Sequence, residues 1–433
     1  MIRGFTAIAG AMVLTVAAWA ASTTATATSP VGRIGELFGA LALVTLAAML
    51  VIATRWPVVD RLFAGQDKAY VAHKWLGLTS LTLLGAHLIT LHAAGLPRSS
   101  LRLVHAGVPA LLLFLVVVVL ALAARRMSYQ KWTRVHLLVV VPYGIGLAHY
   151  IGASSFHALG DSPFSLWMDA INLTGAVAAI WAVVFFGRLG PRRRYVVTDR
   201  RPVATDVAQI RVEPVGRPIT FRPGQFAFVT VPRLKFASHP FTISSGPGEP
   251  LHFTIRALGD DTTRLVRHLR TGDRMTVAGP YGGFNPLDGA ATQLWIAAGI
   301  GITPFRSLWR AGLPDRMTVD LFYAFHGDGG AYLDELRAIS HPNLRVHLVD
   351  TAAEGRLTAA MIASQAPSTG PRDVYFCGPK PLRDTLRRSL PSAGVTLAGF
   401  HFEEFGFGRP STTRRRSASG PVTQPADRHT RRR

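Results

Sequence analysis

The chain has 433 residues, a formal net charge of +22, and hydrophobic residues at 48% of its positions. A mean hydropathy of +0.25 with only 17% charged residues is high for a wholly soluble protein. The length suits about three domains, and the hydrophobic weight falls in the first 190 residues. The single cysteine, Cys377, excludes an internal disulfide and any iron–sulfur cluster held by cysteines.

The positive charge does not indicate nucleic-acid binding. Much of it flanks the hydrophobic segments, and the stretch 409–433 holds eight arginines and one aspartate, a net charge of +7. No basic face interleaved with aromatic residues is present in the sequence. Contact with anionic membrane lipid therefore explains the charge better, and the stretch 409–433, poor in apolar residues, is expected to be disordered.

Six hydrophobic runs are long enough to cross a membrane. They are Phe5–Ala21, Glu36–Thr54, Tyr70–Ala94, Val104–Ala124, Trp132–Gly152 and Leu166–Gly187. The first run also resembles a signal peptide, but we favour a retained helix. With the N-terminus inside, the inner segments hold twelve lysines and arginines and the outer segments hold three. This bias predicts that the second half of the chain is cytoplasmic.

Two of these segments each carry two histidines at nearly the same spacing. His73 and His87 lie 14 residues apart, and His136 and His149 lie 13 apart. At about 1.5 Å per residue either gap covers roughly 20 Å of helix, so each helix offers one imidazole near each face of the membrane. Two such helices side by side would clamp two stacked haems, each iron held by one histidine from each helix. The alternative is that these histidines are buried and bonded to neighbouring carbonyls.

The second helix needs a bend for this arrangement. Fourteen residues return the first helix to nearly the same face, so its two histidines point the same way. Thirteen residues leave His136 and His149 off a common face on a straight helix. Pro142 and Gly144 lie between them and predict a kink that restores the alignment.

After residue 190 the pattern changes to short alternating runs separated by glycine and proline turns, with Pro191–Arg194 as the expected hinge out of the membrane. The predicted strands are Val207–Val212, Gln225–Val231, Leu251–Arg256 and Arg274–Ala278. Such strands predict a small antiparallel barrel. Three further signals lie within it: the turn Arg222–Phe226, the strand edge His239–Ser245 and the tight turn Gly279–Gly282. Each is a common loop by itself, so their order carries the interpretation.

From Thr292 the pattern alternates between strands and helices. The apolar strand Gln293–Ala298 runs into Gly299–Pro304, whose glycines let a pyrophosphate approach the following helix N-terminus. Further strands are predicted at Thr318–Phe325, Leu344–Asp350, Asp373–Cys377 and Ala398–Phe402. This order predicts a doubly wound nucleotide-binding domain with its ligand at the C-terminal ends of the strands.

In combination these motifs resemble the ferric reductase and NADPH oxidase superfamily, in which a haem-bearing helical membrane domain precedes a ferredoxin–NADP reductase-like module. The resemblance runs from about Glu36 to Phe407. It rests on the four histidines and on His239–Thr242, Gly279–Gly282, Gly299–Pro304, Cys377–Pro379 and Phe402–Phe407.

The fold implied has four parts. Residues 1–190 form an α-helical membrane bundle of about six helices, and residues 191–288 an antiparallel β-barrel that binds FAD. Residues 289–408 form a doubly wound α/β domain that binds NAD(P), and residues 409–433 a disordered basic tail. We therefore expect a multi-pass protein of the cell membrane with its FAD and NAD(P) domains in the cytoplasm.

The resemblance also implies individual roles. Two haems b would be ligated by His73 with His136 and by His87 with His149. The residues implied in FAD binding are His239, Pro240, Phe241, Thr242, Arg256, Thr263, Gly279 and Gly282, with Phe405 or Phe407 stacked on the flavin. Those implied for the dinucleotide are Gly299, Gly301, Thr303, Pro304, Cys377, Gly378 and Pro379. The residues expected to act in catalysis are Thr242, Cys377 and Phe405.

The expected activity is that of an NAD(P)H-dependent transmembrane oxidoreductase. NADPH or NADH reduces FAD, and electrons then pass singly through the haems to an external acceptor, for which ferric chelates are favoured. Where relatives often place an arginine for a 2′-phosphate, this chain has Phe325–Gly327, which leaves NADPH and NADH both open. The alternatives are a superoxide-generating oxidase or a donor to a partner protein or quinone. A non-catalytic membrane protein, whose histidines only pack, would show no haem absorbance.

Overall fold

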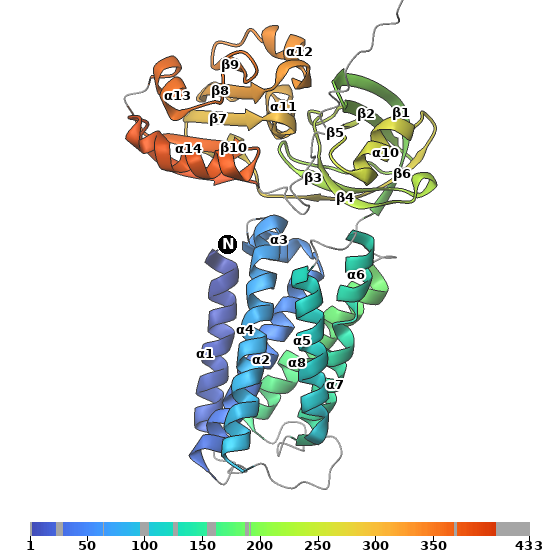
Figure 1. The fold of residues 1–433 in the computed structure, drawn as a ribbon, viewed down its shortest axis with the longest axis vertical. Coiled ribbons are helices and arrows are strands. Elements are labelled where there is room, and N and C mark those ends of the chain that lie inside the picture. Colours follow the sequence, from blue (N-terminus) through green and yellow to red (C-terminus); the bar gives the residue numbers. More distant parts are fainter. Residues whose placement is uncertain are drawn as a thin grey trace, which may run out of the picture.

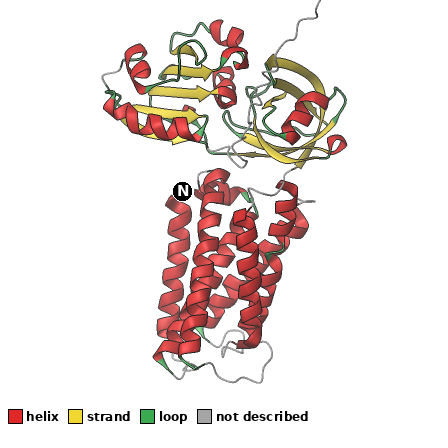
Figure 2. Cartoon of the chain, viewed as in Figure 1, coloured by secondary structure: helices red, strands yellow, loops and turns green. Residues whose placement is uncertain are grey.

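The computed structural model describes residues 2–22, 29–63, 65–95, 104–123, 129–153, 162–186, 190, 192–367 and 370–403. Figure 1 shows a bundle of long helices below two domains that contain the strands. Figure 2 shows the strands gathered in the upper part, where helices flank them. The chain therefore divides into a helical part, a barrel domain and an α/β domain.

The helical part follows the hydrophobic runs. Its elements are α1 (Ile2–Ala21), α2 (Pro30–Ala53), α3 (Pro57–Phe63), α4 (Gln66–Ala93), η1 (Val104–Ala106), α5 (Gly107–Leu122), α6 (Tyr129–Leu137), α7 (Val140–Ala153), α8 (Pro163–Ile180) and the π-helical turn η3 (Trp181–Phe185). Within the described residues, five helical segments are long and apolar enough to cross a membrane, and Gly107–Leu122 is a shorter apolar helix. All six predicted runs fall on these helices.

Local sequence signals begin these helices, and their outer surface suits lipid. Ser29 caps α2, and Ser162 forms a capping box with Ser165 at the start of α8. On the outside of the bundle, the side chains of Ile89 and Leu173 are 69% and 66% exposed. A helix that is apolar on its outer face as well as its inner face belongs in a membrane.

The helix that carries the second pair of histidines is interrupted at Leu138 and Val139, between α6 and α7. Pro142 has no N–H to donate to the carbonyl of Leu138, so a regular helical bond is missing there. The N–H of Val139 donates to the carbonyl of His136 at 3.1 Å, which is a tighter turn than an α-helix. The helix is therefore interrupted where the proline predicted a disturbance, between His136 and His149.

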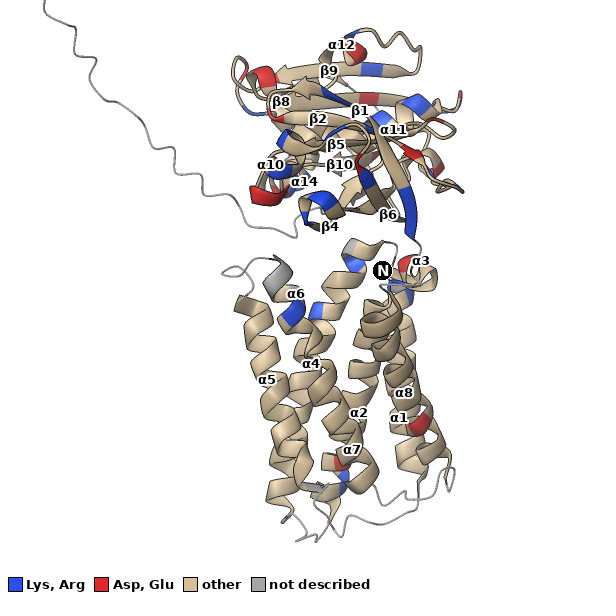
Figure 3. Cartoon of the chain, turned by 90° about the vertical axis from the view of Figure 1, so that its right-hand side faces the viewer, with Lys and Arg blue, Asp and Glu red and all other residues tan. Residues whose placement is uncertain are grey.

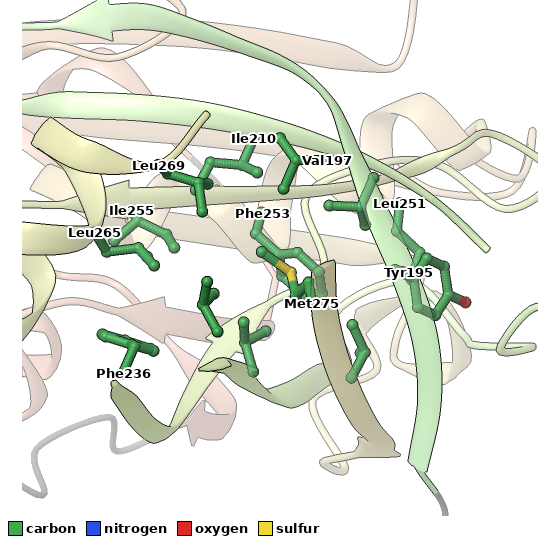
Figure 4. Close-up of a cluster of buried hydrophobic side chains, with 14 of the residues drawn as sticks. Tyr195, Val197, Ile210, Phe236, Leu251, Phe253, Ile255, Leu265, Leu269 and Met275 are labelled. Carbon is green, nitrogen blue, oxygen red and sulfur yellow. The ribbon is translucent and has the colours of Figure 1, made fainter. Parts of the chain in front are cut away.

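The barrel domain is a six-stranded antiparallel sheet. Its strands are β1 (Arg192–Ala204), β2 (Val207–Pro214), β3 (Phe226–Val231), β4 (Phe236–Thr242), β5 (Leu251–Arg256) and β6 (Arg274–Tyr281), in the order β4-β3-β6-β1-β2-β5. An isolated bridge between Ile243 and Phe253 joins the two edges of the sheet. The core inside includes Phe253 and Met275 from strands and Leu265 from the helix α10 (Asp260–His268), as Figure 4 shows.

The prediction of a hinge at Pro191–Arg194 was wrong for the residues described. The first three residues of β1, starting at Arg192, pair with Ala278, Val277 and Thr276 of β6. Their side chains are exposed, whereas Tyr195 and Val197 further along β1 are fully buried. Backbone pairing does not depend on the charged side chains, which obscured the alternation in the sequence.

The α/β domain is a parallel sheet covered on both faces. Its elements are β7 (Thr292–Ala298), η6 (Gly299–Gly301), α11 (Ile302–Ala311), β8 (Thr318–Phe325), η7 (Gly327–Gly329), α12 (Leu333–Arg337), β9 (Leu344–Asp350), α13 (Ala359–Gln365), β10 (Arg372–Cys377), α14 (Lys380–Ser392) and β11 (Leu397–Phe402). The strand order is β11-β10-β7-β8-β9. Phe305 of α11 packs in the core on one face, and Leu386 of α14 packs in the core on the other. This is the predicted doubly wound fold.

A buried polar contact joins the barrel to the α/β domain. Arg306 of α11 is 2% exposed, donates to the carbonyl of Ser244 at 2.7 Å, and pairs with Glu335 at 2.9 Å. The next residue, Ser307, donates to the carbonyl of Ser245 at 2.7 Å. Because these bonds are buried, they hold the barrel and the α/β domain together. They connect the residues that follow β4 to α11, the helix that follows β7.

Candidate functional site

The four histidines inside the helical part form two pairs. The ring centroids of His73 and His136 are 5.9 Å apart, and those of His87 and His149 are 6.2 Å apart. Two imidazoles on opposite sides of one metal ion, with metal–nitrogen distances of about 2 Å, place their ring centroids about 6 Å apart. Both pairs therefore have the spacing of imidazoles that share one metal ion.

Carbonyl groups of α2 orient two of these rings. Nδ1 of His73 lies 3.0 Å from the carbonyl oxygen of Met49, and Nδ1 of His87 lies 2.7 Å from that of Gly35. Because a carbonyl oxygen only accepts, each Nδ1 carries the proton and each Nε2 keeps its lone pair. A ring held in this way is prepared for a metal at Nε2.

Two glycines make room for the outer pair of rings. A side chain at Gly39 of α2 would place its Cβ 2.9 Å from Nδ1 of His87. At Gly107 of α5 the Cβ would lie 2.9 Å from Nε2 of His149. Any larger residue at these positions would displace the rings.

The ligand set suits haem rather than a bare metal ion. Over the described part of the chain, no three His, Cys, Asp or Glu side chains gather where they would hold a metal ion. A metal that finds only two protein ligands needs further donors, and a porphyrin supplies four nitrogens of its own. The two histidine pairs therefore fit two bis-histidine haems.

The motif on β4 pairs with β3, which separates β4 from β6 in the sheet. Thr242 is 7% exposed and stands opposite Phe226 of β3, while Pro240 stands opposite Phe228. The ring of His239 is turned toward Phe236, at a centroid distance of 4.6 Å. Nε2 of His239 is also 3.9 Å from the carboxylate of Asp261 on α10. Phe241, half-buried, packs against the barrel core.

Gly279 in β6 and Gly282 just after it permit a close approach of other parts of the chain. Gly279 and Gly282 have φ angles of +150° and +104°, which other residues rarely adopt. A Cβ at Gly282 would lie 2.8 Å from the carboxylate of Glu403, and one at Gly279 would lie 3.2 Å from Cβ of Ala227. The tight turn therefore brings the end of the barrel against the residue that follows β11.

The glycine-rich turn of the α/β domain is packed against β10. Gly299 has a φ of +56°, and a Cβ at Gly301 would lie 2.1 Å from the carbonyl oxygen of Cys377. Thr303 and Pro304 belong to the first turn of α11, where the hydroxyl of Thr303 donates to a backbone carbonyl. This leaves the N-terminus of α11 at the C-terminal end of β7, as an anion site requires.

Gly378 and Pro379 follow Cys377 at the end of β10. A Cβ at Gly378 would lie 2.9 Å from Cβ of Ala298 at the end of β7, so the two strand ends are in close contact. Arg256, at the end of β5, reaches within 3.5 Å of the Cβ position of Gly299. Arg256 therefore lies where the barrel meets the glycine-rich turn, while Thr263 lies in the first turn of α10.

Cys377 is buried beside an acidic residue. Burial, followed by the carboxylate of Glu403, raises the pKa of the Cys377 thiol well above its usual range. A buried thiol with a raised pKa is a poor nucleophile. Phe405 and Phe407, predicted to stack on the flavin, lie outside the described residues.

Sequence reasoning did not single out Glu403 or Lys68. Glu403 is 5% exposed, and Lys68 lies in the first turn of α4. Both line a cavity of about 270 Å³ where all three parts of the molecule meet. Its other lining residues are Gly283, Phe284, Asn285, Asp288, Tyr375, His401 and Phe402. The acidic pair after the last strand was the available signal for Glu403, whereas nothing local marked Lys68.

Comparison with known proteins matches three segments. Residues 38–147 match the family described as ferric reductase like transmembrane component. Residues 196–285 match an FAD-binding domain, and residues 295–388 match an oxidoreductase NAD-binding domain.

Several curated proteins are similar to part of the chain. The glycine betaine monooxygenase reductase subunit of Chromohalobacter salexigens is 30% identical over 207 residues, 43% of this chain and 56% of that protein. A flavohemoprotein of Rhizobium meliloti is 26% identical over 301 residues, 60% of this chain and 74% of that protein. The chain thus spans little more than half the length of the monooxygenase reductase subunits it matches.

Solved structures are similar over half of the chain. Phthalate dioxygenase reductase aligns with 49% of this chain and 67% of its own, with a TM-score of 0.42 and 22% identity. A ferredoxin NADP⁺ reductase from Neisseria gonorrhoeae aligns with 49% of this chain and 98% of its own, with a TM-score of 0.43 and 17% identity.

Proposed function

We propose that this chain is a membrane-linked NAD(P)H-dependent oxidoreductase that moves electrons across the membrane. Its sequence combines a ferric reductase like transmembrane segment with an FAD-binding and an NAD-binding oxidoreductase segment, and its helices are long and apolar enough to span a membrane. Its resident cofactors are FAD and two haems b. The acceptor on the far side is most favourably a ferric chelate. The observation that carries this proposal is the pair of histidine spacings, 5.9 and 6.2 Å, at two depths of the same helices.

In this proposal each group of residues has a separate role. His73 with His136, and His87 with His149, would hold the two haems. Thr242 is the last residue of β4, and Cys377 is the last residue of β10, where its small side chain would let a nicotinamide approach. Gly299 and Gly301 admit the dinucleotide to the N-terminus of α11. When bound, FAD exchanges hydrides for single electrons and haem iron passes electrons one at a time.

The direction of transfer follows from charge. In Figure 3 most Lys and Arg positions of the helical part lie at the end next to the strand-containing domains. Arg61 belongs to α3 and Arg134 to α6. By the positive-inside rule this end faces the cytoplasm. His149 lies 13 residues beyond His136, roughly 20 Å along the helix, which puts the outer pair near the opposite surface.

A first experiment counts the haems. Protein purified after haem-replete expression is expected to carry two haems per chain, both low-spin, together with one FAD. One haem or none per chain, with the flavin present, would refute the two-haem proposal.

A second experiment tests direction and acceptor. Right-side-out vesicles loaded with NADH or NADPH are expected to reduce an impermeant ferric chelate added outside. Reduction that begins only after the vesicles are broken would contradict transfer across the membrane, even with every cofactor present. Oxygen in place of the chelate tests for a superoxide-generating oxidase.

The second candidate function is electron donation to a protein partner. It is favoured by the similarity of the barrel and α/β domains to proteins named as monooxygenase reductase subunits. In this case a soluble acceptor protein would be reduced by broken vesicles and not by intact ones.

A further inference from the structure

One arginine in a turn of the helical part contacts the barrel domain and has an unusual backbone conformation. Arg55 follows α2 and precedes α3, with a φ angle of +55°. Few residues other than glycine and asparagine occupy this left-handed region. A non-glycine residue persists there where its surroundings hold it, so the contacts of its side chain indicate the reason.

The guanidinium of Arg55 lies against three aromatic rings from three separate elements. Its central carbon is 4.5 Å from the ring centre of Phe228 on β3, 5.2 Å from that of Phe186 at the end of η3, and 5.7 Å from that of Tyr70 on α4. Each distance is within the range of a cation–π interaction. Arg55 thus touches the barrel and two of the membrane helices together.

Two of these rings lie near proposed cofactor sites: Tyr70 is near the inner histidine pair, and Phe228 is near the flavin motif. Tyr70 precedes His73 by three residues, so the two lie one turn apart on α4. Phe228 pairs with Pro240 across the ladder between β3 and β4, two residues before Thr242. Arg55 therefore connects the helix of the inner histidine pair to the strands of the flavin motif.

Aromatic side chains of the barrel form a buried cluster at this junction. Phe226, Phe228 and Tyr281 form a separate buried cluster, with Phe228 and Tyr281 edge to face at 5.5 Å. Burial raises the pKa of Tyr281 to about 12, and the charge of Arg55 opposes this shift to a smaller degree. The cluster therefore lies next to Arg55.

We propose that Arg55 is a positioning residue that sets the distance and orientation of the flavin site relative to the inner histidine pair. Electron transfer between two cofactors slows steeply as they separate, so a loosened junction slows that step. Hydride transfer occurs within the barrel and α/β domains and does not depend on the junction. The electron-transfer part of this inference rests on the proposed function, whereas the docking contact does not.

The test compares two variants of Arg55 with a matched control in the full chain. Arg55→Asn removes the cation and keeps a residue that tolerates the left-handed backbone. Arg55→Lys keeps the charge without the planar guanidinium. The control is Arg33→Asn, because Arg33 makes a cation–π contact with Trp19 at 5.2 Å at the opposite end of α2.

Anaerobic stopped-flow measurements with NADH separate the two steps by their absorbance. Flavin reduction in Arg55→Asn should stay within a factor of about two of the unmodified protein. Haem reduction should slow by roughly tenfold to a hundredfold, the effect of misplacing reacting groups by about 1 Å. Arg55→Lys should be intermediate, and Arg33→Asn should change neither rate. An unchanged haem rate, an equal loss of both rates, or a loss of haem in Arg55→Asn would each overturn the proposal.

Hydrogen exchange gives a readout that needs no haem. Arg55→Asn should speed exchange in the turn 54–56 and in β3 relative to Arg33→Asn. Equal exchange in the two variants would overturn the docking contact. If the unmodified protein carried no haem but the exchange difference were present, the proposed function would fail and the docking role of Arg55 would stand.

Discussion

The helical part and the two strand-containing domains stabilise their buried polar side chains in different ways. Each must hold polar side chains away from water, where an unsatisfied polar group is costly. In the helical part His73 and His87 are held by backbone carbonyls of a neighbouring helix. In the α/β domain Asp320, 2% exposed, is surrounded by Arg345, His347 and Arg372. A buried ionic cluster of this kind suits a soluble core, whereas neutral rings held by carbonyls suit lipid.

The largest effect is expected from the outer histidine pair. His87→Ala removes one of two protein ligands, so the outer haem should be lost and transfer across the membrane abolished. Reduction of the flavin by NADH should continue, because the barrel and α/β domains are untouched. Haem content and stopped-flow flavin absorbance measure the two outcomes. His92→Ala, on the same helix outside the pairs, should retain both haems, and equal losses in the two variants would contradict the assignment.

The ionic contact between the barrel and the α/β domain gives the next largest effect. Arg306→Ala leaves Glu335 and the carbonyl of Ser244 without their buried cation, which should destabilise these domains by about 3 kcal/mol. Thermal unfolding of the full chain measures this. Arg337→Ala, whose side chain is 60% exposed and pairs with Asp334, should cost less than about 1 kcal/mol. Similar costs for both variants would show that the contact does not hold the domains together.

A smaller loss is expected at the glycine-rich turn. Gly301→Ala would place Cβ 2.1 Å from the carbonyl oxygen of Cys377, so the turn must shift at a cost of about 1–3 kcal/mol. The KM for NADH should rise while FAD content stays normal. The control is Gly259→Ala, which has open space around its Cβ and should bind NADH normally. Gly312→Ala would not serve as a control, because the φ of +86° at this position strains any other residue. A normal KM in Gly301→Ala would contradict the dinucleotide site.

His252 of β5 should make the stability of the barrel domain depend on pH. Burial, and next the charge of Arg306, lower the pKa of His252 to about 4 from an ordinary value of 6.5. The unfolded chain therefore binds this proton more readily, so stability should fall as the pH drops from 6.5 toward 4. Unfolding midpoints in denaturant at several pH values measure the slope. His252→Gln should flatten it, and an unchanged slope would exclude His252 as its source.

The smallest effect concerns the choice between NADH and NADPH. The carboxylate of Asp350, at the end of β9, accepts from the N–H of Gly327 at 2.9 Å, and the N–H groups of Gly327 and Ala352 lower its pKa. In this fold the adenosine ribose lies near the end of β8, where a carboxylate disfavours a 2′-phosphate. NADH should therefore be preferred, and Asp350→Asn should shift the ratio of kcat/KM values toward NADPH by roughly threefold to fivefold. Glu354→Gln, which changes a neighbouring carboxylate, is the comparison variant. A preference for NADPH in the unmodified protein would refute the prediction that NADH is preferred.

The sequence by itself determined the elements whose structure is local. The rise of an α-helix is fixed, so the spacing of His73 and His87 was sufficient to predict two depths, and Pro142 to predict the bend before His149. The strands of the barrel and of the α/β domain followed from alternation and from glycine turns. The exception was β1, where Arg192 and its neighbours hid the alternation although their backbone pairs with β6.

Only the tertiary structure decided which distant residues meet. The contact of Arg55 with Phe228, the approach of Glu403 to Gly282, and the position of Lys68 in the central cavity join segments separated by more than a hundred residues. No local periodicity encodes such contacts, because they depend on strand register and on how the domains pack. A helix or strand is specified by its own residues, whereas the junction between the helical part and the barrel exists only once every element around it is in place.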